Sequence, residues 1–372
     1  MASQEQEQNE AQGTPSSFRL SDAEQWASAL LRTRACRRPL LAHLNADTSW
    51  LLQLPWPASH PSRPPGRTHF NILIDPWLRG PQSDVASWFS TQWHVVAPSF
   101  DTVAELDGAL RDIERRILAT SAGDGVDGRP LQNVAADAVS GETSHIDAVA
   151  VSHEFTDHCH QKTLLELSRQ TPVFAPQVAA DLIRGWGHFD NVITAPALEA
   201  RDDWSALAAA GSLPDWLSIG RLVSPGNALY YHSAMVFVLD LGEDAAGDRE
   251  AVIYSPHGVQ SRDLEGIQSS GLRPLALLHG LHEIHLPAKQ LNLGALNGIE
   301  AIAASRAKYW IPSHDEVKKG GGLIAPFLRR TRYSLKEAIS HQEKRLGETS
   351  GSQSPPQYHF IELASGDALC ME

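Results

Sequence analysis

Short apolar runs recur along this chain, separated by segments rich in Gly, Pro and polar residues. Many of the runs contain Val, Ile, Leu and aromatic residues, a composition that is typical of buried strands. The pattern predicts strands over residues 49–54, 70–74, 146–152, 173–174, 229–241, 250–254, 275–278, 282–286, 308–312 and 358–363.

A second pattern, with apolar residues three or four positions apart, predicts helices between these strands. Ser21 and Glu24 fit a capping box. Trp26, Leu30 and Leu31 then follow at helical spacing. Strands and helices in this order favour an α/β protein with sheets inside and helices outside. The expected helices cover residues 21–34, 102–118, 161–170, 177–185, 296–306 and 334–345.

The polar segments predict the loops and the domain organisation. Residues 1–18 are rich in Gln, Glu and Ser, so we expect a disordered tail there. Residues 19–372 are expected to form a single domain. Surface loops or turns are predicted over residues 55–67, 120–143, 242–249 and 347–357.

Composition excludes several classes of protein. The net charge of −13 and the lack of a long Lys/Arg stripe argue against a nucleic-acid partner. The short basic groups, at residues 318–319 and 329–332, are interpreted as solvated surface or as contacts to an anionic substrate. No apolar stretch has the length of a membrane span, the N-terminus lacks the apolar core of a secretory signal, and three cysteines suit a reducing compartment. We therefore expect a cytoplasmic protein with a small-molecule substrate and no membrane partner, and its oligomeric state stays open.

The strongest chemical signal lies directly after the apolar run 149–151. His153, Asp157, His158 and His160 fall within eight residues of one another. Imidazole and carboxylate groups so close together, at the end of a buried strand, are typical of a zinc, manganese or iron site. Each residue alone also fits a hydrogen-bonded loop residue, so the metal hypothesis rests on the grouping.

Other candidates also follow predicted strands. His257 and His314 each come just after an apolar strand, and Asp75 ends another. All three fit either a site or an ordinary turn. His232 lies within the strand predicted over 229–241, where it faces either the site or the opposite side. Cys159 stands between two histidines, and its exposure and reactivity are left open.

Residues 146–192 resemble the first signature of the metallo-β-lactamase superfamily, and most of all its divergent sugar-lactonase-like branch. In the common motif, H-x-H-x-D-H, the first two histidines hold one metal ion and the Asp-His pair helps to hold a second. His153, Asp157 and His158 match this motif, whereas Phe155 stands at the second histidine. A phenylalanine cannot bind a metal ion, so the first metal position is impaired.

The resemblance extends over about residues 40–315 and assigns further positions. His160 fits a D-H-x-H-x-x-T-L variant of the same branch, which makes it a replacement ligand. His257 lies in a Pro-His-Gly sequence, where the superfamily usually has an aspartate that bridges two ions. His314 matches the histidine that completes the second metal set. Asp75 ends a strand beside the metal loop, where it would orient a ligand.

The resemblance implies the αββα sandwich of the superfamily, an α/β fold with two mixed sheets face to face and helices outside. It also implies a hydrolase of an ester, lactone or related carbonyl compound that uses a metal-bound hydroxide, with Asp157 and His153 as catalytic residues. The alternative is a non-hydrolytic protein of this fold, which binds a small metabolite, catalyses isomerase- or lyase-type chemistry, or is inactive. One divalent ion, with zinc favoured over manganese or iron, is expected to be bound by Asp157, His158, His257, His314 and His160.

Overall fold

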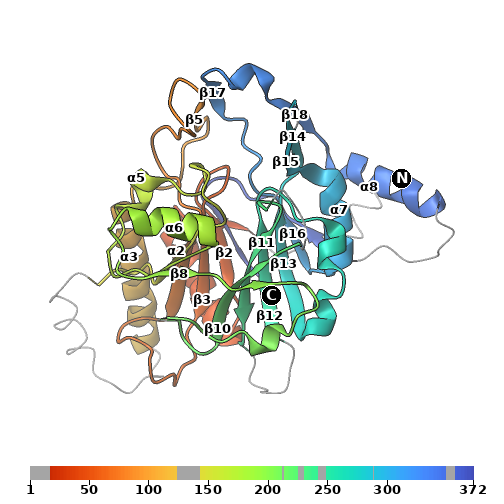
Figure 1. Cartoon of the computed structure of the whole chain (residues 1–372). Helices are drawn as coiled ribbons and strands as arrows, with labels where there is room; N and C mark the ends of the chain where they lie inside the picture. Colours follow the sequence, from red (N-terminus) through yellow and green to blue (C-terminus); the bar gives the residue numbers. More distant parts are fainter. Residues whose placement is uncertain are drawn as a thin grey trace.

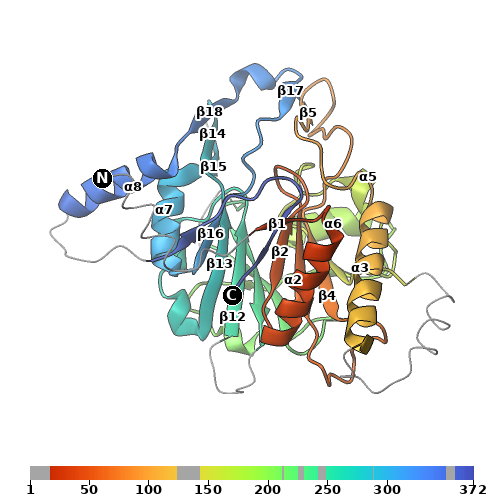
Figure 2. The same cartoon turned by 180° about the vertical axis from the view of Figure 1, so that it is seen from behind.

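Two β-sheets lie face to face in the molecule, and helices cover their outer faces (Figures 1 and 2). The αββα sandwich expected from the sequence is confirmed by this arrangement of layers. The structure is a computed structural model, which describes residues 17–123, 143–211, 213–224, 230–241, 249–287, 289–348 and 357–372.

The first sheet combines N-terminal strands with the last strand of the chain. In the described residues its strand order is β1-β20-β2-β3-β4-β6-β7-β8. The pairs from β1 to β4 are antiparallel, and those from β4 to β8 are parallel. The carboxyl ends of β4 and β6 therefore meet at one edge, where α/β sheets often bind ligands. The strands are β1 (Phe18–Arg19), β2 (Leu40–His43), β3 (Trp50–Pro55), β4 (His69–Ile74), β6 (Ala148–Ala150), β7 (Val173–Ala175), β8 (Val192–Thr194) and β20 (Asp367–Cys370).

The second sheet comes from the C-terminal half of the chain. Its order in the described residues is β19-β16-β13-β12-β11-β10-β9. Strands β12, β13, β16 and β19 are parallel, whereas β10, β11 and β12 form an antiparallel meander. The carboxyl ends of β12 and β16 thus also lie at a common edge. The strands are β9 (Ala197–Leu198), β10 (Leu217–Leu222), β11 (Ala234–Leu239), β12 (Arg249–Ser255), β13 (Leu272–His279), β16 (Tyr309–Ile311) and β19 (His359–Phe360).

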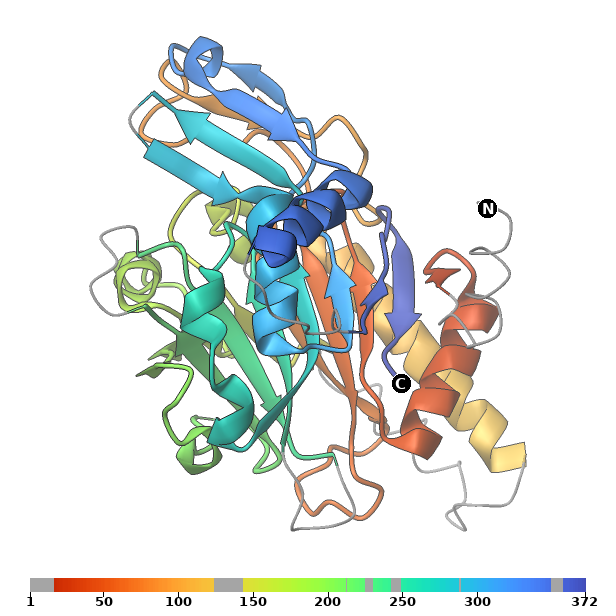
Figure 3. The same ribbon diagram turned by 90° about the vertical axis from the view of Figure 1, so that its right-hand side faces the viewer.

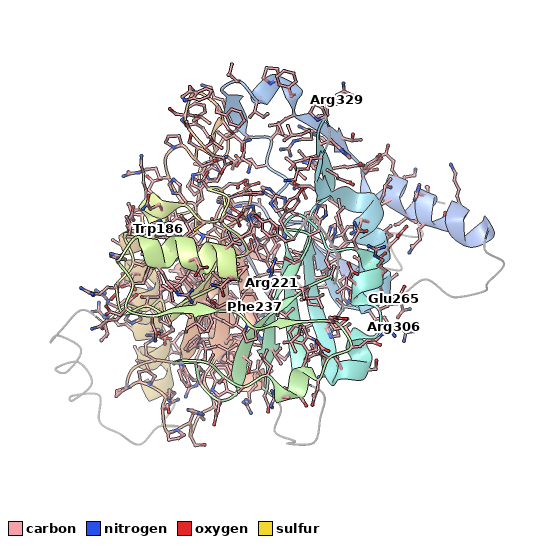
Figure 4. The ribbon with its side chains drawn as sticks, in the orientation of Figure 1. Trp186, Arg221, Phe237, Glu265, Arg306 and Arg329 are labelled. Atoms are coloured by element: carbon pink, nitrogen blue, oxygen red, sulfur yellow. The ribbon has the colours of Figure 1, made fainter. Side chains whose placement is uncertain are left out.

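Three apolar layers hold the sandwich together. Phe174, Phe237 and Tyr254 are fully buried between the sheets, and Figure 4 shows Phe237 in the middle of the molecule. A second layer packs α2, α3 and α6 on the first sheet, and a third packs α7 and α8 on the second sheet. Each buried aliphatic or aromatic side chain stabilises the fold by about 1.5–3 kcal/mol. The helices are α2 (Ala23–Cys36), α3 (Val103–Gly123), α5 (Gln161–Leu164), α6 (Gln177–Gly185), α7 (Gly294–Ser305) and α8 (Leu335–Glu348), with 3₁₀ turns η1 (Trp204–Ala206), η2 (Ser261–Leu264), η3 (Ile267–Ser270) and η4 (Ala325–Phe327).

A lobe of short strands rises from one end of the sandwich (Figure 3). Strands β14, β15 and β18 form a small antiparallel sheet, and β5 pairs with β17 beside it. Figure 4 places Arg329 of β18 near the outer end of this lobe. No described helix has both the length and the apolar composition needed to cross a membrane. The lobe strands are β5 (Thr91–Trp93), β14 (His282–Leu286), β15 (Lys289–Leu293), β17 (Lys319–Gly321) and β18 (Arg329–Arg332).

The two largest differences between predicted and observed helix boundaries are in α5 and α3. The helix expected over 161–170 is wrong in length, because α5 ends at Leu164 and the chain continues in tight turns. Helix α3 continues to Gly123, so the loop predicted from residue 120 begins later. Most of that loop, residues 124–142, lies outside the described residues.

Most of the strands that the sequence did not predict are short or lie at sheet edges. The predicted tail ended at residue 18, but Phe18 is 8% exposed and pairs with Ala368 in β1. Residues 1–16 lie outside the described residues, as do 242–248 and 349–356 of two predicted turns. Short strands contain too few residues to show a period of two. The other strands missed are β2, β5, β8, β9, β10, β15, β17, β18 and β20.

The packing of α7 on the second sheet predicts an asymmetric response to glycine substitution. A Cβ atom at Gly298 would lie 2.6 Å from the Trp310 ring, whereas one at Gly108 of α3 would meet no atom within 4 Å. Gly298→Ala is expected to destabilise the protein by about 1–3 kcal/mol through overpacking. Gly108→Ala is expected to stabilise it by up to about 1 kcal/mol through helix propensity. Urea unfolding of both variants tests this, and equal shifts of the two midpoints would contradict the packing of α7.

Candidate metal centre

The predicted site residues lie at one end of the sandwich, where parallel strands of both sheets have their carboxyl ends. In the first sheet, β4 leads to Asp75 and β6 leads to the loop 152–160. In the second sheet, β12 leads to His257 and β16 leads to His314. This is the upper end in Figure 1, where α5 lies and from which the lobe rises.

Four predicted histidines form one buried cluster. The His158 ring centroid lies 3.9 Å from that of His153, 5.1 Å from that of His257 and 4.8 Å from that of His314. The four rings are all buried. Asp157 borders them, with Oδ1 3.6 Å from His158 Nε2 and Oδ2 3.8 Å from His314 Nε2. The structure thus brings together all of the predicted site residues except His160.

Two residues at this end adopt an unusual backbone conformation. Asp75 has φ 44° and His314 has φ 64°, in the left-handed region that side chains other than glycine seldom occupy. Backbone hydrogen bonds hold both, from Asp75 N to Ala150 O at 2.9 Å and from His314 N to Asp47 O at 2.8 Å. Conformations of this kind cluster at functional sites, where the surrounding structure sustains them.

Three of the clustered histidines are oriented by hydrogen bonds from their outer ring nitrogen. In each case Nδ1 faces an oxygen acceptor, so the ring proton belongs on Nδ1 and the Nε2 lone pair faces the cluster. Metal-binding histidines are usually held in this way. The three contacts are His158 Nδ1 to Asp75 Oδ2 at 2.6 Å, His257 Nδ1 to Asn292 Oδ1 at 3.0 Å and His314 Nδ1 to Asp47 Oδ1 at 3.0 Å.

The inner ring nitrogens fit a metal ion. Within the part of the chain that the structure describes, Nε2 of His153, His158 and His257 is buried and has no hydrogen-bond partner. Such orphaned polar atoms are uncommon in folded proteins and call for an explanation. Ligand atoms lie within 4.8 Å of one another in two overlapping groups of described residues. The groups are His153, His158 and His257, and Asp157, His158 and His314.

The carboxylates around the cluster favour positive charge at the His158 position. Burial alone would lower the pKa of His158, but the carboxylates of Asp157 and Asp75 outweigh it and raise that pKa. Burial, followed by the charge of His158, lowers the pKa of His153 and His257 well below the ordinary value. The rings of His153 and His257 are therefore neutral at physiological pH, and neutrality is what a metal-binding ring such as His257 requires.

His153 differs from the other three histidines in its hydrogen bonding. Its Nδ1 accepts a hydrogen bond from Phe155 N at 3.3 Å, so the proton of the neutral ring belongs on Nε2. Nε2 faces the cluster, and its N–H is a donor. The ring of Phe155 lies 5.9 Å from His257 and 5.8 Å from Tyr231, and forms an apolar wall where the common motif has a ligand.

Two charged residues of the site, Lys318 and Asp47, were missed by the sequence interpretation. Lys318, interpreted as solvated surface or as a contact to an anionic substrate, has a side chain only 5% exposed. Its Nζ lies 2.6 Å from Asp47 Oδ2 and 2.8 Å from Asp157 Oδ2. Burial opposes both charges, yet the mutual attraction raises the pKa of Lys318 and lowers that of Asp157. The one available signal was position, since Lys318 follows His314 by four residues in the same loop.

Three other candidates lie outside the cluster. His160 has Nδ1 2.8 Å from Thr163 Oγ1 and Nε2 3.4 Å from Pro81 O, so the structure does not bring it to the site as a replacement ligand. His232 Nε2 lies 3.1 Å from Leu291 O. Cys159 is 1% exposed, and burial raises the pKa of its thiol, which makes it unreactive.

The hydrogen bond between Asp75 and His158 predicts a role in metal affinity. Asp75→Asn replaces the carboxylate that holds the Nδ1 proton of His158, and is expected to lower the affinity for a divalent ion by roughly 10–100-fold. Asp215→Asn is a matched control, since it removes a carboxylate from a surface pair with His60 at 2.9 Å. Competition with a chromophoric chelator measures both affinities. Equal affinities in the two variants would show that Asp75 does not act on His158.

Neither a comparison with protein-family models nor a search of curated proteins found a match for this chain. Several solved structures resemble it in backbone trace. A possible metal-dependent hydrolase from Veillonella parvula is 12% identical, with TM-score 0.49, covering 90% of this chain and 99% of its own. An isothiocyanate hydrolase from Delia radicum gut bacteria is 14% identical, with TM-score 0.47 and the same coverage. A metallo-β-lactamase fold protein from Bacillus subtilis is 10% identical, with TM-score 0.38, covering 89% of this chain and 98% of its own.

Proposed function

We propose that this protein is a metal-dependent hydrolase with a single divalent ion, zinc in preference to manganese or iron. One observation carries the proposal: three buried histidines direct Nε2 into one cluster, and each has its Nδ1 held by an oxygen acceptor. Asp157, His158 and His314 form one group of ligand atoms and would hold the ion, and His257, which shares the other group with His158, would complete the set. Imidazole and carboxylate ligands suit these metals.

Bound there, a divalent ion lowers the pKa of a water molecule and polarises a carbonyl or phosphoryl oxygen. The protein's own groups supply the rest of the chemistry. Asp157 Oδ1 lies beside His158, on the side of the carboxylate that Lys318 does not contact, and would accept a hydrogen bond from an attacking water and orient it. His153 presents its Nε2 proton to the same space, where it would donate a hydrogen bond to an oxygen that becomes negative.

We propose an ester or lactone as the substrate class. A neutral N–H donor at His153 suits the oxygen of a carbonyl group that gains charge during attack. The apolar rings of Phe155 and Tyr231, with centroids 5.8 Å apart, line the side of His257 and would contact the carbon skeleton of such a substrate. An uncharged, mainly apolar acyl compound fits these two features together.

A second candidate is a non-hydrolytic protein of the same fold. The contact that favours it is the ion pair between Lys318 and Asp157, which satisfies one oxygen of this carboxylate without any metal. In that case the cluster would bind a small metabolite through its ring nitrogens.

Elemental analysis of tag-free protein separates the two candidates, together with a panel of aryl esters and lactones. We expect about one tightly held ion per chain and hydrolysis of at least one substrate class in proportion to the ion content. If no ion is retained after reconstitution with zinc, manganese or iron, the hydrolase proposal fails and metabolite binding becomes the better candidate. An ion without hydrolysis of any ester or lactone would reject the substrate class alone.

A further inference from the structure

Lys318 lies between two buried carboxylates at the edge of the histidine cluster. Its Nζ is 2.6 Å from Asp47 Oδ2 and 2.8 Å from Asp157 Oδ2. The Asp47 side chain is 0% exposed and that of Asp157 is 11% exposed, so water screens these charges little. The ammonium group of Lys318 thus contacts two carboxylate oxygens, in the way that a metal cation contacts two of its oxygen ligands.

The carboxylates that hold Lys318 are also connected to the ring nitrogens of the cluster. Asp157 contacts Lys318 through Oδ2 and approaches His158 Nε2 through Oδ1 at 3.6 Å. Asp47 contacts Lys318 through Oδ2 and accepts from His314 Nδ1 through Oδ1 at 3.0 Å. Each carboxylate therefore links the ammonium group to the ligand cluster. Lys318 Nζ therefore lies next to the cluster, and the Asp157 carboxylate borders both the ammonium group and the His158 ring.

A cation is needed at this place for electrostatic reasons. Two buried carboxylates without a positive partner would each bear a large desolvation cost. A second metal ion is one solution, and a lysine on the adjacent loop is another. His257 supplies only one lone pair, so it cannot replace a carboxylate that would bind two ions through separate oxygens.

We propose that the Lys318 ammonium group permanently occupies the second cation position, which makes the centre mononuclear. This inference rests on the proposed function, which requires one ion at the histidine cluster. Lys318 is a positioning residue: it fixes Asp157 so that Oδ1 faces His158, and it fixes Asp47 so that Oδ1 faces His314. Removal of its side chain would open a site for a second divalent ion between Asp47 and Asp157.

Metal stoichiometry tests this inference without any assay of activity. Wild type, Lys318→Ala and Lys319→Ala are reconstituted with zinc or manganese, desalted and measured by elemental analysis. Lys319 is the matched control, since it is the next lysine in the chain, is exposed, and has its Nζ 5.9 Å from the centroid of the Trp93 ring. The expected stoichiometries are one ion in wild type and Lys319→Ala, and two in Lys318→Ala.

Each other result has a defined meaning. One ion in all three proteins overturns the inference and leaves the proposed function intact. Two ions in wild type also overturn it, because Lys318 would then not exclude the second ion. No ion in wild type with one in Lys318→Ala would support Lys318 as a substitute cation but reject the proposed function. No ion in any of the three rejects both.

A folding failure of Lys318→Ala would also be informative. Lys318→Gln, with an uncharged side chain of similar length, is prepared in parallel, and both variants are expressed and refolded with and without divalent ions. Folding only in the presence of the ion supports the inference, because the ion then replaces the lost ammonium group. Failure of both variants to fold under either condition counts against it, since a divalent ion then cannot take this position.

Discussion

Replacing His158 with alanine is expected to abolish tight metal binding and, with it, measurable hydrolysis. His158 belongs to both groups of potential ligands, and its Nε2 has no other partner among the described residues. Carboxylates also lie on both sides of its ring: Asp75 accepts a hydrogen bond from Nδ1, and Asp157 borders Nε2. Loss of an outer partner costs about 10–100-fold in affinity, so loss of the central ligand is expected to cost roughly 100-fold or more.

His160→Ala is the matched control for His158→Ala. The two histidines are two residues apart in one loop, and both are buried. His160 makes its contacts with Thr163 and Pro81, away from the cluster. We expect His160→Ala to retain its ion and its activity, as measured by elemental analysis and by the ester and lactone panel. Retention of the ion by His158→Ala, or its loss from both variants, would be inconsistent with the cluster as the metal centre.

The histidines of the site could be predicted because each follows a strand that the sequence shows clearly. Apolar runs end just before the His153 loop, before His257 and before His314. Parallel pairing aligns the carboxyl ends of β4 and β6 in the first sheet and those of β12, β13 and β16 in the second. The helices on the outer faces were also visible, since their apolar positions repeat at helical spacing. The lobe was not visible as a unit, because its strands are short and pair across large sequence separations.

The charged partners of the site could not be predicted from local sequence. Lys318 looks like a surface residue because it belongs to a Lys-Lys pair followed by three glycines. Its burial depends on Asp47 and Asp157, which come from distant parts of the chain. The residues that decide which ring nitrogen of each histidine carries the proton are also distant in the sequence. Asn292 orients His257 from β15, and Asp75 orients His158 from the end of β4.

The Phe155 position shows how one substitution changes the interpretation of a motif. From sequence, the loss of a histidine there indicated an impaired first metal position. In the structure, His153 still joins the cluster, but its Nδ1 accepts from Phe155 N and its Nε2 carries the proton. The same residue type at the same place thus changes from a ligand to a hydrogen-bond donor. The hydrogen bond comes from the backbone N–H of Phe155, so it depends on the path of the loop and not on the phenylalanine side chain.

Removal of the metal ion is expected to lower hydrolysis by about three orders of magnitude or more. A single hydrogen-bond donor to a developing oxyanion is worth about 10²–10³ in rate, and under the proposed function a bound ion would both polarise the substrate and activate water. The protein groups that remain are His153, as one donor, and Asp157, whose pKa is held low by Lys318 against the effect of burial. A weakly basic carboxylate cannot by itself deprotonate ordinary water efficiently.

The measurement is a rate on the preferred ester or lactone before and after dialysis against a chelator, with elemental analysis of the same samples. Thermal unfolding is followed in parallel, since the fold is expected to survive without the ion while its stability falls. At a free ion concentration of a hundred times the dissociation constant, binding raises the free energy of unfolding by about 2.7 kcal/mol. Re-addition of the ion should restore both this stability and the rate. A rate that persists in protein free of metal would place the catalysis on the His153 and Asp157 pair alone. Such a result would also give Lys318 a role in catalysis, because Lys318 keeps Asp157 ionised on the Nε2 side of His158, whereas Asp75 contacts Nδ1 on the outer side of that ring.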